Sequence, residues 1–311
     1  MTTPRIDDFP AVRRRGLRRL KDVPVLPSLV TLGNVFFGFL AIAKVADALR
    51  LAQPGASFGT VVGLFETASI LVFVAMVFDA LDGRVARMTG QTTPFGAQLD
   101  SLADMVTFGV APAFLGKVLV DWHAQIDDNR LLPLQPKLFY AAAAVYVLCA
   151  ALRLARFNVE TGADEEDHRE FKGLPSPAAA AVVCSLVALF CTSHDGETDL
   201  GRWLLGHDNF DKIVIAMPGV LALLGLLMVS RVPYPHAMSA ILRGRHSMPF
   251  LAGLVVVIVI AAVEWQFAMV VCTLGYVVWG MLVGLYRVVT RHRDDDDVDE
   301  DPAPRPTPSR N

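Results

Sequence analysis

The chain has 311 residues, of which 53% are hydrophobic and 19% are charged, and its mean hydropathy is +0.45. Soluble proteins have an apolar fraction of about 45–50%, and their cores rarely need runs of about 20 apolar residues, the length that crosses a bilayer as a helix. This chain contains several such runs. They exclude an ordinary soluble protein and predict an all-α, polytopic transmembrane helical bundle, with the lipid bilayer and no nucleic acid as a partner.

The formal net charge of −3 hides two oppositely charged ends. Residues 1–24 are basic. We expect a cytoplasmic juxtamembrane arm on the anionic inner leaflet, although a topology signal explains these cations equally well. Residues 291–311 are acidic and then rich in proline and serine. Because such a segment has little to bury, we expect a disordered cytoplasmic tail.

Eight apolar segments are candidate spans. They lie near residues 26–45, 60–82, 98–120, 138–157, 175–193, 212–230, 249–264 and 266–287. The seventh is short, and its link to the eighth, around residues 264–266, must be a tight hairpin. We assign residues 25–193 to a catalytic transmembrane core and residues 194–290 to the remaining transmembrane helices.

Lysine and arginine in short loops predict the orientation, because these residues resist translocation. With the N-terminus inside, the inner loops hold Arg84 and Arg87 after the second span, and the inner end of the fourth span holds Arg153 and Arg156. An even number of spans then places both termini in the cytoplasm. We expect a multi-pass protein of the cytoplasmic (inner) membrane.

Four aspartates lie where the second and third spans meet their short link. Asp79 and Asp82 are three residues apart, and Asp100 and Asp104 are four apart. Both spacings place a pair on one face of a helix. Because the link is short, the two helices are expected to be neighbours whose acidic faces converge at the cytoplasmic boundary.

Four carboxylates in one pocket repel each other unless cations neutralise them, and Mg²⁺ and Mn²⁺ prefer carboxylate oxygens. Two such ions can clamp a diphosphate. Helix capping or exposure to water would explain any one aspartate alone. Gly83 and Gly96 would let a ligand approach the helix backbone. Arg87 is placed to contact a phosphate or, alternatively, to anchor the helix end.

Two strings in this region together resemble the signature of the CDP-alcohol phosphotransferase family. They are D-x-x-D-G-x-x-A-R and, after a gap of eight residues, G-x-x-x-D-x-x-x-D. They match without deviation at Asp79, Asp82, Gly83, Ala86, Arg87, Gly96, Asp100 and Asp104. The resemblance implies a membrane enzyme that transfers a phosphatidyl-type group from a CDP-linked donor to an alcohol and releases CMP. It also favours a homodimer.

The same resemblance implies roles for the matching residues. Asp79, Asp82 and Asp100 would bind two divalent ions, and Asp104 would be a further ligand or the general base. Gly83, Ala86 and Arg87 would line the nucleotide site.

Three further stretches suggest which alcohol is the acceptor. Leu26–Ile42, Ala151–Val159 and Phe171–Ala180 resemble membrane-embedded phosphatidylserine synthases, which implies CDP-diacylglycerol and L-serine as substrates. Thr31 and Asn34, one turn apart, are candidates for contact with the cytidine or its ribose, or for helix packing. Arg153 and Arg156 are candidates for the serine carboxylate or the donor phosphate, or for membrane anchoring.

Other functions fit some of these features. Glycerol 3-phosphate or an inositol phosphate would be the acceptor in other members of the family, and water would be the acceptor in a metal-dependent lipid hydrolase. A cation-coupled transporter would place its acidic groups near mid-membrane and break helices in paired halves. The aspartates here lie at a boundary, and the halves show no such pairing.

Overall fold

The computed structural model describes residues 25–52, 57–89, 93–126, 136–161, 173–195, 210–230, 232, 248, 252–253, 255, 259 and 264–298. The described part is all-helical, as the sequence predicts. Its elements are α1 (Val25–Leu51), α2 (Phe58–Thr89), α3 (Pro94–Asp104), the π-helix η3 (Met105–Val110), α4 (Ala111–Ile126), α5 (Pro136–Thr161), α6 (Ser176–Asp195), α8 (Phe210–Val229) and α11 (Trp265–Val298).

Six helical stretches are long and apolar enough to cross a membrane, and α6 contains a shorter apolar helix, Ser176–Thr192. Each of the first six predicted spans corresponds to one of these helices. Most of the seventh predicted span, 249–264, lies outside the described residues, as does the whole basic arm, 1–24. The total of eight spans and the cytoplasmic location of both termini therefore stay predictions.

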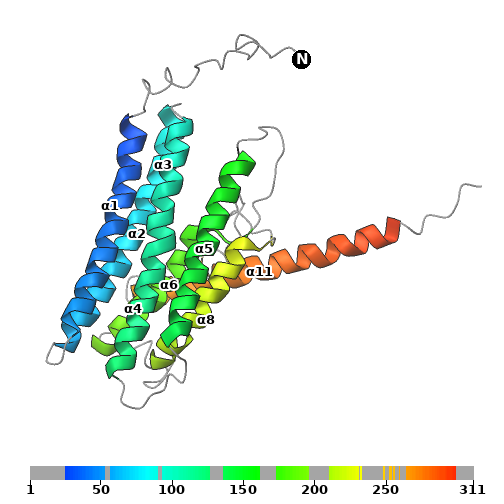
Figure 1. Cartoon of the computed structure of the whole chain (residues 1–311). Helices are drawn as coiled ribbons and strands as arrows, with labels where there is room; N and C mark the ends of the chain where they lie inside the picture. Colours follow the sequence, from blue (N-terminus) through cyan, green and yellow to red (C-terminus); the bar gives the residue numbers. More distant parts are fainter. Residues whose placement is uncertain are drawn as a thin grey trace, which may run out of the picture.

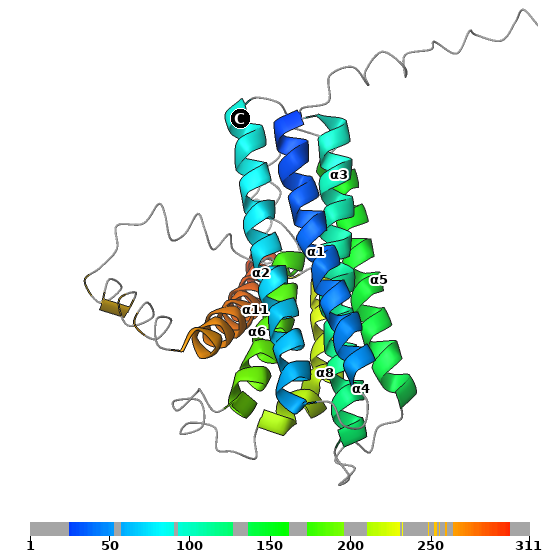
Figure 2. The same cartoon turned by 90° about the vertical axis from the view of Figure 1, so that its left-hand side faces the viewer.

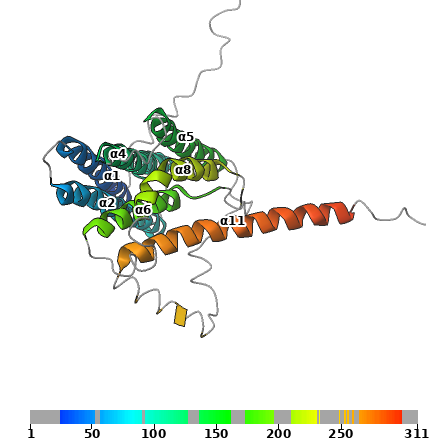
Figure 3. The ribbon, with the colours of Figure 1, turned by 90° about the horizontal axis from the view of Figure 1, so that it is seen from below.

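The predicted eighth span falls in α11, whose apolar part is Trp265–Gly284. Figure 1 shows that α11 runs across the other helices instead of alongside them, and Figure 3 shows it beside α6. Apolar composition predicts the length of this helix but not its direction. The helix continues to Val298, so the first residues of the predicted tail are helical, and the rest of that tail lies outside the described residues.

The helix that begins at Pro94 is the centre of the bundle. Its apolar window is 67% buried, against 28–39% in the other five candidate spans. The C-terminal part of this helix, α4, contacts α1, α2, α5, α6 and α8. Large buried side chains form the core here: Phe108 and Leu115 of this helix, with Phe65, Tyr146 and Phe190 from the helices around it.

The start of α3 is defined by its own sequence. Thr93 has an extended backbone, and its hydroxyl accepts a hydrogen bond from the Gly96 N–H at 3.1 Å. Pro94 follows in the first helical turn, where its missing N–H is not needed. As Figure 2 shows, the start of α3 lies at the same end of the bundle as the start of α1 and the end of α2.

A short segment before α6 is fastened to the end of α8. The N–H groups of Gly173 and Leu174 donate to the carbonyl oxygens of Val232 and Leu227, at 2.9 and 3.0 Å. Gly173 has a φ of +94°, and a Cβ at this position would lie 2.3 Å from the carbonyl oxygen of Met228. Only glycine fits this conformation and this contact. The segment fixes where α6 begins.

Gly173→Ala should therefore destabilise the protein. The unfavourable backbone conformation alone costs about 1–3 kcal/mol, and the clash with the Met228 carbonyl adds to it. We expect a clearly lower melting temperature in detergent. Gly219→Ala, in α8, is the control, because nothing lies within 4 Å of its added Cβ. Equal melting temperatures for the two variants would contradict this account of the segment.

Candidate active site

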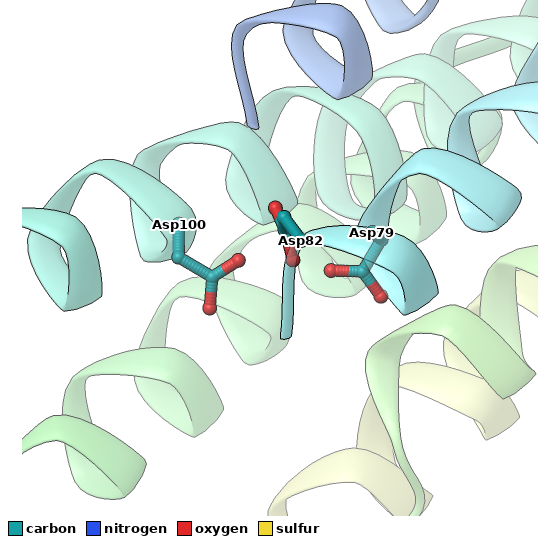
Figure 4. A group of neighbouring side chains, drawn as sticks. All are labelled: Asp79, Asp82 and Asp100. Carbon is teal, nitrogen blue, oxygen red and sulfur yellow. The ribbon is translucent and has the colours of Figure 1, made fainter. Parts of the chain in front are cut away.

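The four predicted aspartates come together between α2 and α3. One carboxylate oxygen from each of Asp79, Asp82 and Asp100 lies within 4.8 Å of the others. Figure 4 shows these three side chains pointing into the same space between the two helices. The carboxyl group of Asp104 contacts that of Asp79. The expected convergence of the two acidic faces is thus present in the fold.

Several oxygens of these carboxyl groups lack a hydrogen-bond partner among the described residues. Asp82 is buried and the other three aspartates are half-buried. One oxygen each of Asp82, Asp100 and Asp104 is shielded from solvent and has no hydrogen-bond partner among the described residues. Unpartnered carboxylate oxygens that lie close together are costly to bury. Because such oxygens are the preferred ligands of Mg²⁺ and Mn²⁺, the residues present fit divalent cations.

An open pocket adjoins the aspartates. It contains five of the residues predicted for the site, Thr31, Gly83, Ala86, Arg87 and Gly96, together with Asp82 and Asp100. The complete lining among the described residues is Pro27, Ser28, Thr31, Asp82, Gly83, Ala86, Arg87, Thr93, Gly96, Ala97 and Asp100. The pocket is formed by the start of α1, the end of α2 and the start of α3. A ligand in it would lie directly against the acidic cluster.

Gly83 keeps part of this pocket open. A Cβ added there would meet only the guanidinium nitrogens of Arg87, at 3.9 and 4.0 Å. A larger side chain would therefore extend into the space of the pocket rather than into packed protein. Packing therefore does not require a glycine at this position.

Gly83→Leu is expected to raise the KM for a nucleotide-linked donor at least about tenfold, because about 1.4 kcal/mol of lost binding free energy suffices for this change. The melting temperature should stay close to that of the wild type. Gly63→Leu is the matched control on α2, since nothing lies within 4 Å of a Cβ at Gly63. A donor KM unchanged in Gly83→Leu would show that this pocket does not receive the donor.

Arg153 is the cation associated with the acidic cluster from the side of α5. It is half-buried, and it lies within electrostatic range of Asp104, Tyr146 and Tyr276. Its Nη1 donates a hydrogen bond to the hydroxyl of Ser176 at 2.7 Å. Ser176 is buried at the start of α6, directly after the segment that Gly173 fastens to α8. The position of Arg153 thus depends on α6 and α8.

Five predicted site residues lie outside the pocket lining: Asp79, Asp104 and Arg153, described above, and Asn34 and Arg156. Asn34 is fully buried one turn deeper in α1 than Thr31, and neither end of its amide has a partner among the described residues. Arg156 is half-buried three residues after Arg153 and does not line the described pocket. Thr31, by contrast, contacts Asp82 and donates to the carbonyl oxygen of Pro27 at 3.1 Å.

Several polar residues of this region are absent from the predicted site. Ser28 lines the pocket with a buried, unpartnered hydroxyl, and its spacing of three residues from Thr31 would have indicated a shared helix face. Thr93 also lines the pocket, and a threonine before a proline is a typical helix cap. The hydrogen bond between Arg153 and Ser176 joins distant parts of the chain, so no local pattern indicates it.

Comparison with known proteins shows the family of the chain. Residues 24–224 match the family described as CDP-alcohol phosphatidyltransferase. A Helicobacter pylori (strain J99) protein named CDP-diacylglycerol–serine O-phosphatidyltransferase is 34% identical over 212 residues, which cover 68% of this chain and 72% of that protein.

Other organisms contain relatives as well. The archaetidylserine synthase of Methanothermobacter thermautotrophicus is 35% identical over 170 residues, or 54% of this chain and 60% of that protein. A Saccharomyces cerevisiae CDP-diacylglycerol–serine O-phosphatidyltransferase is 33% identical over 162 residues, or 50% of this chain and 51% of that protein.

The fold and the site together define a helical membrane protein with a pocket that ends in clustered carboxylates. The match covers the whole acidic cluster and more than half of the chain. The chain belongs to the CDP-alcohol phosphatidyltransferase family and is a membrane-embedded transferase of phospholipid biosynthesis.

Proposed function

We propose that the chain transfers the phosphatidyl group of CDP-diacylglycerol to the hydroxyl of L-serine and releases CMP. The observation that carries this proposal is the cluster of Asp79, Asp82 and Asp100, with Asp104 beside it, at the end of a pocket. The choice of serine is supported by the names of the relatives from Helicobacter pylori and yeast.

The pocket provides a place for the donor. The cytidine and its phosphates lie between α1, α2 and α3, where Gly83, Ala86 and Gly96 leave room and Arg87 offers a cation. Thr31 is placed to contact the nucleotide, whereas Asn34 lies too deep in α1 to line the same pocket. The acyl chains stay in the membrane between helices.

The aspartates Asp79, Asp82, Asp100 and Asp104 would hold two divalent ions, Mg²⁺ or Mn²⁺. When bound, these ions neutralise the diphosphate and stabilise the charge that develops on it during transfer. This role explains why carboxylate oxygens without protein partners are retained at this position.

Serine reaches the cluster from the side of α5. The guanidinium of Arg153 receives its carboxylate, because the planar fork of arginine matches that group. Asp104 accepts the proton of the serine hydroxyl as general base. The serine oxygen forms a bond to the phosphorus that carries diacylglycerol, the bond from this phosphorus to the oxygen of the CMP phosphate breaks, and CMP leaves with the electron pair.

Ser176→Ala tests the placement of Arg153. Without the hydroxyl at 2.7 Å the guanidinium loses a fixed partner, and we expect the KM for serine to rise about three- to tenfold while the KM for CDP-diacylglycerol is unchanged. Ser185→Ala, also in α6, is the control, since its hydroxyl pairs with Thr273 at 3.0 Å. Similar serine KM values for both variants would remove Ser176 from the acceptor site.

An acceptor screen tests the proposed reaction itself. Detergent-purified protein with CDP-diacylglycerol and Mg²⁺ or Mn²⁺ should release CMP when L-serine is added, and phosphatidylserine should appear in equal amount. Glycerol 3-phosphate and an inositol phosphate are the alternative acceptors within the family. A dianionic acceptor would require additional cations at the mouth of the site. CMP release with either phosphate but not with serine would overturn the choice of acceptor.

We further propose that the site opens to the cytoplasm and that the chain forms a homodimer in the inner membrane. The orientation rests on Arg84, Arg87, Arg153 and Arg156, which lie at the site's end of the bundle, and on the rule that cations stay inside. The homodimer rests on the family resemblance alone. Protease access to an N-terminal tag in inside-out vesicles tests the orientation, and the mass in detergent solution tests the dimer.

A further inference from the structure

The helix that carries Asp100 and Asp104 changes its geometry directly after Asp104. Residues Met105–Val110 form the π-helix η3, and the Ala111 N–H donates to the carbonyl of Val106, five residues earlier. Such turns are rare, and they are frequent at functional sites. Because this geometry is uncommon, contacts from other helices are needed to hold it.

Two hydrogen bonds from side chains hold this turn. The hydroxyl of Tyr146, on α5, donates to the Phe108 carbonyl at 3.0 Å, and Tyr146 and Phe108 are both fully buried. On the other side, the Thr107 hydroxyl donates to the Asn34 carbonyl of α1 at 3.3 Å. A buried phenol and a buried carbonyl both need a hydrogen-bond partner, and here the phenol of Tyr146 and the carbonyl of Phe108 satisfy each other.

Helix α8 supports Tyr146 from behind. A Cβ at Gly225 of α8 would lie 3.1 Å from the Cα of Tyr146, so the two backbones pack in direct contact. Helix α8 corresponds to the sixth predicted span. Its contact at Gly225 fixes the backbone from which the Tyr146 hydroxyl reaches η3.

The π-helix affects the direction of Asp104. One extra residue in a turn rotates the helix on its far side by about 100°, since an α-helix has 3.6 residues per turn. Asp100 and Asp104 lie on one side of the extra residue, and the buried Phe108 and Ala111 lie within or after it. The angle between the acidic face and the face that packs in the core is therefore set by η3.

We propose that Tyr146 is a positioning residue for Asp104. It acts through its hydrogen bond to Phe108, which holds the π-helix and thereby keeps the Asp104 carboxyl group against Asp79 in the cluster. The inference deepens the proposed function and rests on it, because Asp104 is there the group that accepts the proton of serine. Tyr146 itself contacts no substrate in this proposal.

Tyr146→Phe tests the inference, because it removes the hydroxyl and keeps the buried ring. We expect kcat with serine to fall about tenfold, as when a buried carbonyl loses its donor, with both KM values within about twofold of the wild type. Amide hydrogen exchange should become faster in residues 105–111 and stay unchanged in the rest of the bundle. Thr107→Val, which removes the second hydrogen bond of the turn, should have the same two effects.

Tyr140→Phe is the matched control on the same helix, because Tyr140 is 60% exposed. It should retain the wild-type kcat and exchange. Wild-type kcat in Tyr146→Phe, unchanged exchange in residues 105–111, or faster exchange throughout the bundle with a lower melting temperature would overturn the inference. Failure of the proposed function would be seen separately, as no serine-dependent CMP release by the wild type.

Discussion

Asp100→Asn is expected to reduce serine-dependent CMP release by more than about a hundredfold. Mutation of residues that only support metal ligands already lowers metal affinity or activity about 10- to 100-fold, and Asp100 is a proposed ligand itself. Asp100 carries an unpartnered buried oxygen within 4.8 Å of the Asp79 and Asp82 carboxylates. Asparagine has nearly the same shape but no charge. The variant should therefore bind divalent ions poorly without losing its fold.

The melting temperature distinguishes a loss of metal binding from a loss of the fold. Removing one of several repelling carboxylates should leave the melting temperature in metal-free buffer equal or higher. The control is Asp47→Asn, which should retain both activity and stability. Asp47 lies near the end of α1, whereas the pocket is at the start of this helix. A melting temperature that falls in Asp100→Asn would show that Asp100 has a structural role instead. Activity within about threefold of the wild type would show that the reaction does not depend on Asp100.

Arg153→Ala should lower kcat/KM for serine by about 30-fold, because a hydrogen bond to a charged group such as the serine carboxylate contributes about 1.5–3 kcal/mol. Arg153 lies within electrostatic range of Asp104 and is held by Ser176. Arg153→Lys keeps the charge but loses the planar fork, and we expect an intermediate effect on the KM for serine.

Arg156→Ala is the comparison variant for Arg153→Ala, because Arg156 is a cation of the same helix, three residues further along. Steady-state kinetics with serine varied at saturating CDP-diacylglycerol measures both variants. If Arg156→Ala impairs the use of serine more than Arg153→Ala does, the acceptor site is on a different part of α5 from the one we propose.

Local patterns predicted the parts of the molecule that depend on local geometry. Long apolar runs indicated the helices, and spacings of three and four residues indicated that Asp79 and Asp82, and Asp100 and Asp104, each share a face. A short link implied that the two faces meet. These steps need only the pitch of a helix, which is why the acidic cluster is visible from the sequence.

Features that depend on contacts between distant segments were not predictable in this way. A π-helix inserts one residue into a turn, and the apolar pattern around Met105–Val110 does not show it. The pair of Arg153 and Ser176 and the depth of Asn34 depend on how α1, α5 and α6 pack. The crosswise direction of α11 is likewise a property of packing, because composition indicates only that a helix is long and apolar.

The binding of Mn²⁺ to detergent-purified protein in the presence of CDP, followed by electron paramagnetic resonance, tests the role of the acidic cluster most directly. Two ions per chain are expected for the wild type, with strongly weakened binding in the double variant Asp82→Asn, Asp100→Asn. No bound Mn²⁺ in the wild type, or equal binding by both proteins, would contradict the assignment of these carboxylates as the site at which the nucleotide-linked lipid reacts.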